Sequence, residues 1–150
     1  YKRQIEDSFE VLECEFQKLV SHFDPEKGIN CYFCRHLGMI THYVSDYFTF
    51  PHNANYSGNI KDHCIYEEEL KKELRAYVHS PEAVRRREKM EMHTPADILA
   101  MIRQMHNRYL QMESVVKRDC QYIIELCHKV VDAVLCFLES LSAAKVSVAM

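Results

Sequence analysis

The last third of the chain, from Ala96 to Met150, contains neither glycine nor proline. Within it, apolar residues recur at steps of three or four from Ile98 to Leu141, the spacing that places side chains on one face of an α-helix. This pattern predicts one helix of roughly 45 residues, about 70 Å long at 1.5 Å per residue. Its C-terminal half is apolar on several faces, so we expect the other helices to pack around it.

One irregularity interrupts the spacing. Met112, Val116 and Cys120 follow one another at two successive steps of four, and an extra step of four locally relaxes a helical supercoil. A break near Glu113–Ser114 is therefore the alternative to a continuous helix, because Ser114 can cap the start of a second one.

Three earlier segments, residues 5–23, 31–50 and 60–79, carry the same helical spacing. Ser80-Pro81-Glu82 is typical of a helix start and predicts a fourth, short and polar helix. The chain has only three Gly and four Pro, far fewer than an all-β fold uses for its turns. The sequence thus predicts an all-α fold, an irregular helical bundle of four to five helices organised on a long C-terminal helix. We expect residues 1–150 to form a single helical domain and, because the chain begins at Tyr1, to be a fragment of a longer protein.

Charge and cysteine content suggest where the protein works. The net charge is −3, which gives no general attraction to nucleic acid or anionic lipid. The longest apolar run, Val130 to Leu138, is nine residues, whereas a membrane-spanning helix needs about 20. Seven Cys is an odd number, which favours free thiols in a reducing compartment. We therefore expect an intracellular protein, cytoplasmic or nuclear, although Asn55-Tyr56-Ser57 matches a glycosylation site of secreted proteins.

The best candidate metal site begins with the C-x2-C pair Cys31 and Cys34. His63 and Cys64 would complete a tetrahedral zinc site. A single C-x2-C pair is not specific, and the predicted helix after Cys34 carries the chain away from it. The sequence therefore predicts no cofactor, with zinc at these four residues as the alternative.

No catalytic arrangement is evident from residue spacing. Cys127 and His128 are neighbours, so on a helix they point about 100° apart and cannot act as a nucleophile and its base. Glu67, Glu68 and Glu69 lie next to lysines, which a solvated helix face explains. No glycine-rich phosphate loop is present. These features predict a protein that is not an enzyme and has no small-molecule substrate.

Two groups of side chains suggest a docking surface instead. Methionine-rich helix faces are adaptable binding surfaces, and a basic cluster can contact an acidic partner. The predicted partner-binding residues are Met101, Met105, Tyr109, Met112, Arg85, Arg86 and Arg87. The leading hypothesis is a non-enzymatic interaction or scaffold domain of an intracellular multiprotein complex, with a protein partner or self-association. We expect no membrane contact, and no nucleic-acid contact except through Arg85–Arg87. The alternatives are a zinc-stabilised regulatory or nucleic-acid-associated module and a secreted, helical cytokine-like factor.

Overall fold

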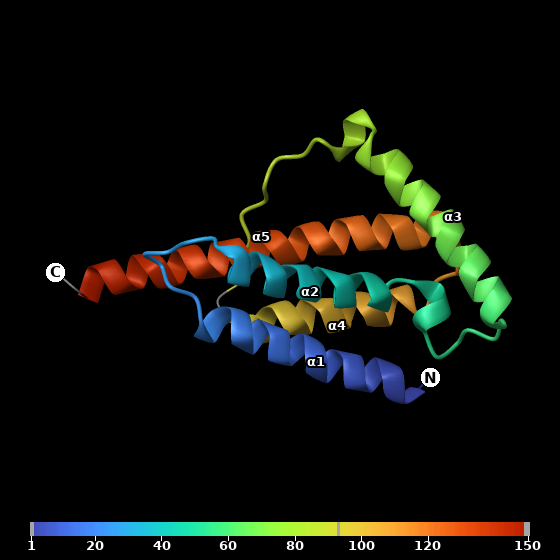
Figure 1. Ribbon diagram of the computed structural model, residues 1–150, viewed down its shortest axis with the longest axis horizontal. Helices are drawn as coiled ribbons and strands as arrows, with labels where there is room; N and C mark the ends of the chain where they lie inside the picture. Colours follow the sequence, from blue (N-terminus) through green and yellow to red (C-terminus); the bar gives the residue numbers. More distant parts are fainter. Residues whose placement is uncertain (1, 93, 149–150) are drawn as a thin grey trace.

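The computed structural model describes residues 2–92 and 94–148, and these residues form α-helices and 3-10 turns without any strand (Figure 1). The helices are α1 (Lys2–Ser21), α2 (Cys31–Tyr47), α3 (Ile60–Val78), α4 (Pro95–Tyr109) and α5 (Val116–Val148). Two short 3-10 turns, η1 (Phe50–His52) and η2 (Pro81–Ala83), follow α2 and α3. The predicted all-α bundle on a long C-terminal helix is confirmed. None of the described helices is both long enough and apolar enough to cross a membrane.

The core lies between α1, α2, α4 and α5, which run alongside one another, while α3 is set at an angle across the start of α5 (Figure 1). Each of these four helices contributes a residue almost fully excluded from solvent, namely Phe16, Ile40, Ile102 and Leu126. Full burial of such a side chain stabilises the fold by about 1.5–3 kcal/mol. The apolar spacing of the sequence therefore identifies the buried faces correctly.

The last third of the chain is two helices, so the prediction of one continuous helix is wrong and the alternative break is confirmed. The Tyr109 hydroxyl at the end of α4 donates to Asp119 Oδ1 on α5 over 2.8 Å. In an unbroken helix these residues would be about 15 Å apart along the axis. The turn between the helices, residues 110–115, lets α4 fold back against α5.

The predicted short helix after Ser80 is also absent, since beyond η2 residues 84–92 have no helical structure. Ion pairs to α5 hold this segment instead. Arg85 Nη2 lies 2.6 Å from the buried Asp132 Oδ2, and the Glu88 backbone N–H donates to the same oxygen over 2.9 Å. Arg87 pairs with Glu139 at 2.6 Å. Tertiary hydrogen bonds thus override the local helix-start signal.

A buried amide anchors the turn that follows α2. Asn53 Nδ2 donates to the carbonyls of Thr49 (2.9 Å) and Tyr47 (3.2 Å), and its Oδ1 accepts from His106 Nε2 at 2.8 Å. His106 lies among the rings of Tyr47 and Phe48. Burial lowers the pKa of His106 to about 4, against the opposing effect of the Tyr47 carbonyl. His106 is therefore a neutral hydrogen-bond donor at neutral pH.

This histidine makes stability depend on pH. Above its ordinary pKa of 6.5, His106 is neutral in both the folded and the unfolded chain. As the pH falls from 6.5 to about 4, only the unfolded chain takes up the proton, so the free energy of unfolding falls by about 3 kcal/mol in total. Urea unfolding at a series of pH values should show that His106→Gln, which retains a donor, loses less stability over this interval than the unaltered chain. If the free energy of unfolding fell equally with pH in the two proteins, His106 would not be the group responsible for this loss.

Candidate metal centre

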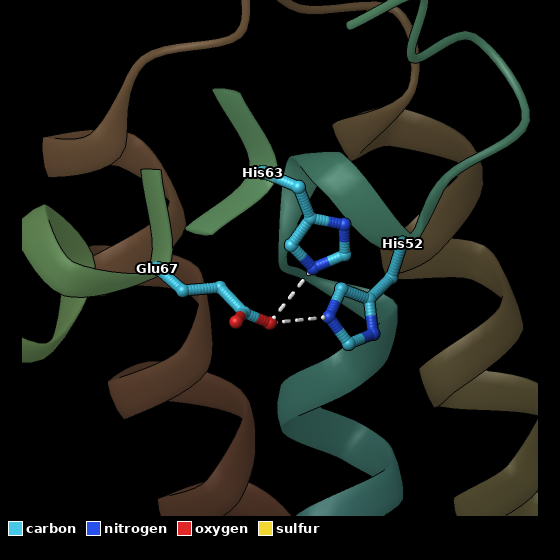
Figure 2. Close-up of side chains that lie close together, drawn as sticks. All are labelled: His52, His63 and Glu67. Carbon is cyan, nitrogen blue, oxygen red and sulfur yellow. Dashed lines mark hydrogen bonds and ion pairs between the residues drawn. The ribbon is translucent and has the colours of Figure 1, made fainter. Parts of the chain in front are cut away.

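Three potential metal ligands converge where the chain passes from α2 to α3. They are His52 from η1 and His63 and Glu67 from α3 (Figure 2). One ligand atom from each lies within 4.8 Å of the others. Among the side chains that the structure describes, in residues 9–92 and 94–143, this is the one group of three His, Cys, Asp or Glu with such spacing.

The start of α3 places two of these ligands. Asn59 caps the helix by accepting from the Lys61 and Asp62 backbone N–H groups, and Asp62 completes a capping box. The helix therefore has a defined start, and His63 and Glu67, four residues apart, share one face. His63 Nε2 lies 2.9 Å from Glu67 Oε1.

The third ligand comes from the 3-10 turn. His52 ends η1, between the buried residues Pro51 and Asn53. Its Nε2 is 2.9 Å from Glu67 Oε1, the same oxygen that faces His63 (Figure 2). The hydrogen bond from His52 holds the pKa of Glu67 below its ordinary value, against the opposing effect of burial, and the bond from His63 adds to it. Glu67 is therefore an anion at neutral pH.

A further carboxylate lies on the other side of His52. Asp46 Oδ1, in the last turn of α2, is 3.7 Å from His52 Nδ1, and its Oδ2 is 3.6 Å from His42 Nε2. A carboxylate beside the non-coordinating nitrogen of a histidine fixes the orientation of the ring. Asp46 and His42 thus extend the group of donors along α2.

The cluster has the properties of a metal site. Two imidazole nitrogens and one carboxylate oxygen are a set that zinc binds with an open fourth position. His63 Nδ1 is buried without a hydrogen-bond partner, which is unusual for a ring held only for packing. The Glu67 side chain is 47% exposed, so the open side is accessible to solvent. These residues fit a catalytic rather than a closed structural metal ion.

The metal ligands proposed from the sequence are brought together only in part. His63 lies in the cluster, and Cys64 follows it but is exposed. Cys31 and Cys34 are exposed in the first turn of α2. This helix has 17 residues, so its ends are about 25 Å apart and the cluster lies beyond the far one. The four proposed ligands therefore do not surround a common point.

The proposed partner-binding residues are largely used by the fold itself. Tyr109 is buried, and Met101 and Met105 pack against the core. Met112 is exposed, with its sulfur accepting from the Tyr122 hydroxyl. Arg85 forms an ion pair with Asp132 and Arg87 with Glu139, both on α5. Among the described residues, Arg86 forms no such ion pair with α5. No continuous apolar stripe of these residues is left on the described surface.

Two members of the cluster, His52 and Glu67, were missed by the reasoning from sequence. The sequence places Glu67 in a run of three glutamates next to lysines, which a solvated helix face explains. The informative signal was His63-x3-Glu67, since this spacing puts an imidazole and a carboxylate on one helix face. The preceding His42-x3-Asp46 repeats it. Nothing in the local sequence indicates that the turn brings His52 to the same place.

Comparison with known proteins identifies one related family. The family model described as zinc dependent phospholipase C matches residues 3–130, a span that includes His52, His63 and Glu67. No curated protein and no solved structure matches the chain.

This match corrects several predictions. An enzyme family contradicts the non-enzymatic scaffold, complex-subunit and docking hypotheses and the prediction that the protein is not an enzyme. A family that is described as phospholipases, and therefore acts on lipids, contradicts the expectation of protein partners without a small-molecule substrate. The intracellular location is overturned as well, because members of this family are typically secreted bacterial proteins. Zinc, given as the alternative to no cofactor, is the metal on which the family depends.

The cluster predicts which variants lose zinc. Replacing an outer partner of a metal ligand typically weakens metal binding by 10–100-fold, so His63→Ala, which removes a ligand, should weaken it by more than about a hundredfold. Isothermal titration with chelator-buffered zinc measures the affinity.

His79→Ala is the matched control, because His79 is exposed at the other end of α3 and its Nδ1 lies 2.7 Å from Arg75 O of the same helix. It should bind zinc as the unaltered chain does. The double variant Cys31→Ser, Cys34→Ser tests the alternative ligands. Loss of zinc from that variant, with His63→Ala unaffected, would contradict the site.

Proposed function

Since the chain belongs to the zinc-dependent phospholipase C family, we propose that it hydrolyses phospholipids at a zinc centre held by His52, His63 and Glu67. A phospholipase C adds water across the bond between phosphorus and the glycerol oxygen. The hydroxyl goes to phosphorus and the proton to the glycerol oxygen, which gives a diacylglycerol and a phosphorylated headgroup. The convergence of two imidazoles and a carboxylate within 4.8 Å, in the span that matches the family, carries this proposal.

The three ligands leave a coordination position for water or a phosphate oxygen. When bound, zinc would lower the pKa of a coordinated water and stabilise negative charge on the phosphate. The ionised Glu67 contributes one negative charge and the two histidines contribute none when neutral. The set is therefore net positive once it holds a divalent cation, which suits an anionic phosphodiester.

Asp46 supports this set from α2. Its carboxylate lies between His52 Nδ1 and His42 Nε2 at 3.7 and 3.6 Å. A proton on His52 Nδ1 is therefore stabilised, which leaves Nε2, on the Glu67 side, free to coordinate. This arrangement favours the tautomer that a metal ligand needs.

The exposure of the site suits a bulky substrate. The side chains of Glu67 and His42 are 47% and 63% exposed, so a headgroup can approach from solvent. The apolar side chain of Ile60 is 74% exposed and lies one turn before His63 on the same face of α3. An apolar residue at that position can contact the lipid part of the substrate.

The proposal predicts a specific product pair. With zinc, the chain should release diacylglycerol and a water-soluble phosphate monoester from phosphatidylcholine in mixed micelles, as followed by phosphorus NMR. Glu67→Gln keeps the size of the side chain but removes its charge, and should lower kcat/KM by more than about a hundredfold. A chelator should abolish the activity of the unaltered chain, and added zinc should restore it.

Glu68→Gln is the matched control, because Glu68 is the next carboxylate along α3 and faces Lys71 at 3.8 Å. Its activity should equal that of the unaltered chain. Phosphatidylethanolamine and phosphatidylinositol micelles test the headgroup. Release of free fatty acid or phosphatidic acid, or no product from any of these lipids by zinc-loaded protein, would contradict the proposed function.

A further inference from the structure

We propose that Asp119, a buried residue of α5, is a positioning residue that sets the distance between the two segments that carry the metal ligands. This inference rests on the proposed zinc centre and assigns a role within it to a residue that does not touch the metal ligands. Asp119 is 0% exposed, and three donors from three other parts of the chain meet its carboxylate.

A single oxygen atom joins the two ligand-bearing segments. Asp119 Oδ2 accepts from the Phe50 backbone N–H and from the Tyr66 hydroxyl, each over 2.8 Å. Phe50 is the first residue of η1, two positions before His52, and Tyr66 directly precedes Glu67 on α3. Both ligand segments are thus held to one point on α5.

The second oxygen of the same carboxylate serves a different purpose. Asp119 Oδ1 accepts from the Tyr109 hydroxyl over 2.8 Å, and Tyr109 ends α4, which carries none of the metal ligands. The two oxygens therefore separate two roles. Oδ2 connects η1 with α3, and Oδ1 connects α4 with α5.

Energetics argue that the carboxylate is there for its directional bonds. Burying a carboxylate is costly unless hydrogen bonds compensate it, and burial raises the pKa of Asp119 against the opposing effect of the Phe50, Tyr66 and Tyr109 bonds. An apolar side chain would fill the same space without that cost. An apolar side chain could not hold the Phe50 N–H and the Tyr66 hydroxyl at one point, because it has no acceptor for their hydrogen bonds.

Metal binding is sensitive to such placement. Zinc–nitrogen distances are about 2.0–2.1 Å, with a tolerance of about 0.2 Å. His52 Nε2 comes from η1, whereas His63 Nε2 and Glu67 Oε1 come from α3, so a shift of η1 against α3 by more than this tolerance would disrupt the set. The Phe50 and Tyr66 rings also pack against each other, with their centroids 6.0 Å apart, so the two residues that bond to Asp119 Oδ2 are in contact as well.

The test compares two tyrosines that bind the same carboxylate. Tyr66→Phe removes the bond that ties α3 to Asp119 Oδ2, and Tyr109→Phe removes the bond to Oδ1. Both variants delete one hydroxyl and leave the ring in place, so both should lose similar stability in urea unfolding. Zinc affinity, measured by chelator-buffered titration, should fall about tenfold in Tyr66→Phe and by less than about twofold in Tyr109→Phe.

Asp119→Ala removes the acceptor of all three hydrogen bonds and should weaken zinc binding further. If this variant does not fold, the comparison of Tyr66→Phe with Tyr109→Phe still tests the role of Asp119. Equal zinc affinity in Tyr66→Phe and Tyr109→Phe, whether both are reduced or both unchanged, would overturn the role of Asp119. If in that case the unaltered chain still binds zinc and hydrolyses phospholipid, only this inference fails. An unaltered chain that binds no zinc overturns the proposed function together with it.

Discussion

A buried carboxylate on α5 is the constraint on which the rest of this fold depends. Asp119 accepts hydrogen bonds from η1, α3 and α4, so four parts of the chain meet at one side chain. Transfer of an ionised carboxylate from water to the protein interior costs several kcal/mol. Hydrogen bonds to both of its oxygens offset this cost. These bonds hold η1 and α3 to α5 and keep the end of α4 folded back against it.

A second aspartate repeats this principle further along α5. Asp132 is also buried and accepts from Arg85 and from the Glu88 backbone N–H. It fixes the segment that returns from α3 to α4, where local sequence signals favour a helix. The long helix is therefore more than an apolar surface for its neighbours. Asp119 positions the η1 turn and Asp132 positions the segment after η2, and neither of these stretches is α-helical.

The difference between what the sequence predicts and what it does not follows from this arrangement. Apolar spacing depends on neighbours within one helix, so the buried faces of α1, with Phe9, Leu12, Phe16 and Leu19, could be predicted directly. The break before α5 is accompanied by a hydrogen bond between Tyr109 and Asp119, whose partners belong to different helices. The spacing irregularity at Met112 marked the position of the break but could not decide its existence, because the deciding contact is tertiary.

The metal centre illustrates the same limit more sharply. Part of the candidate site follows from local sequence, because His63 and Glu67 are four residues apart and therefore share one face of α3. From the sequence, Glu67 could also pair with Lys71 one helical turn later, and the structure shows which partner it has. Lys71 Nζ lies 3.8 Å from Glu68 Oε2. Glu67 Oε1 instead lies 2.9 Å from the Nε2 atoms of both His52 and His63. An exposed lysine pair contributes less than about 1 kcal/mol, so the histidines determine the orientation of this carboxylate. His52 supplies the second of them from a turn that two buried side chains anchor, since Asn53 bonds to the Thr49 carbonyl and Asp119 accepts from the Phe50 N–H. The Asp119 bond joins residues 69 positions apart in the sequence, which is why no local pattern predicts where His52 lies.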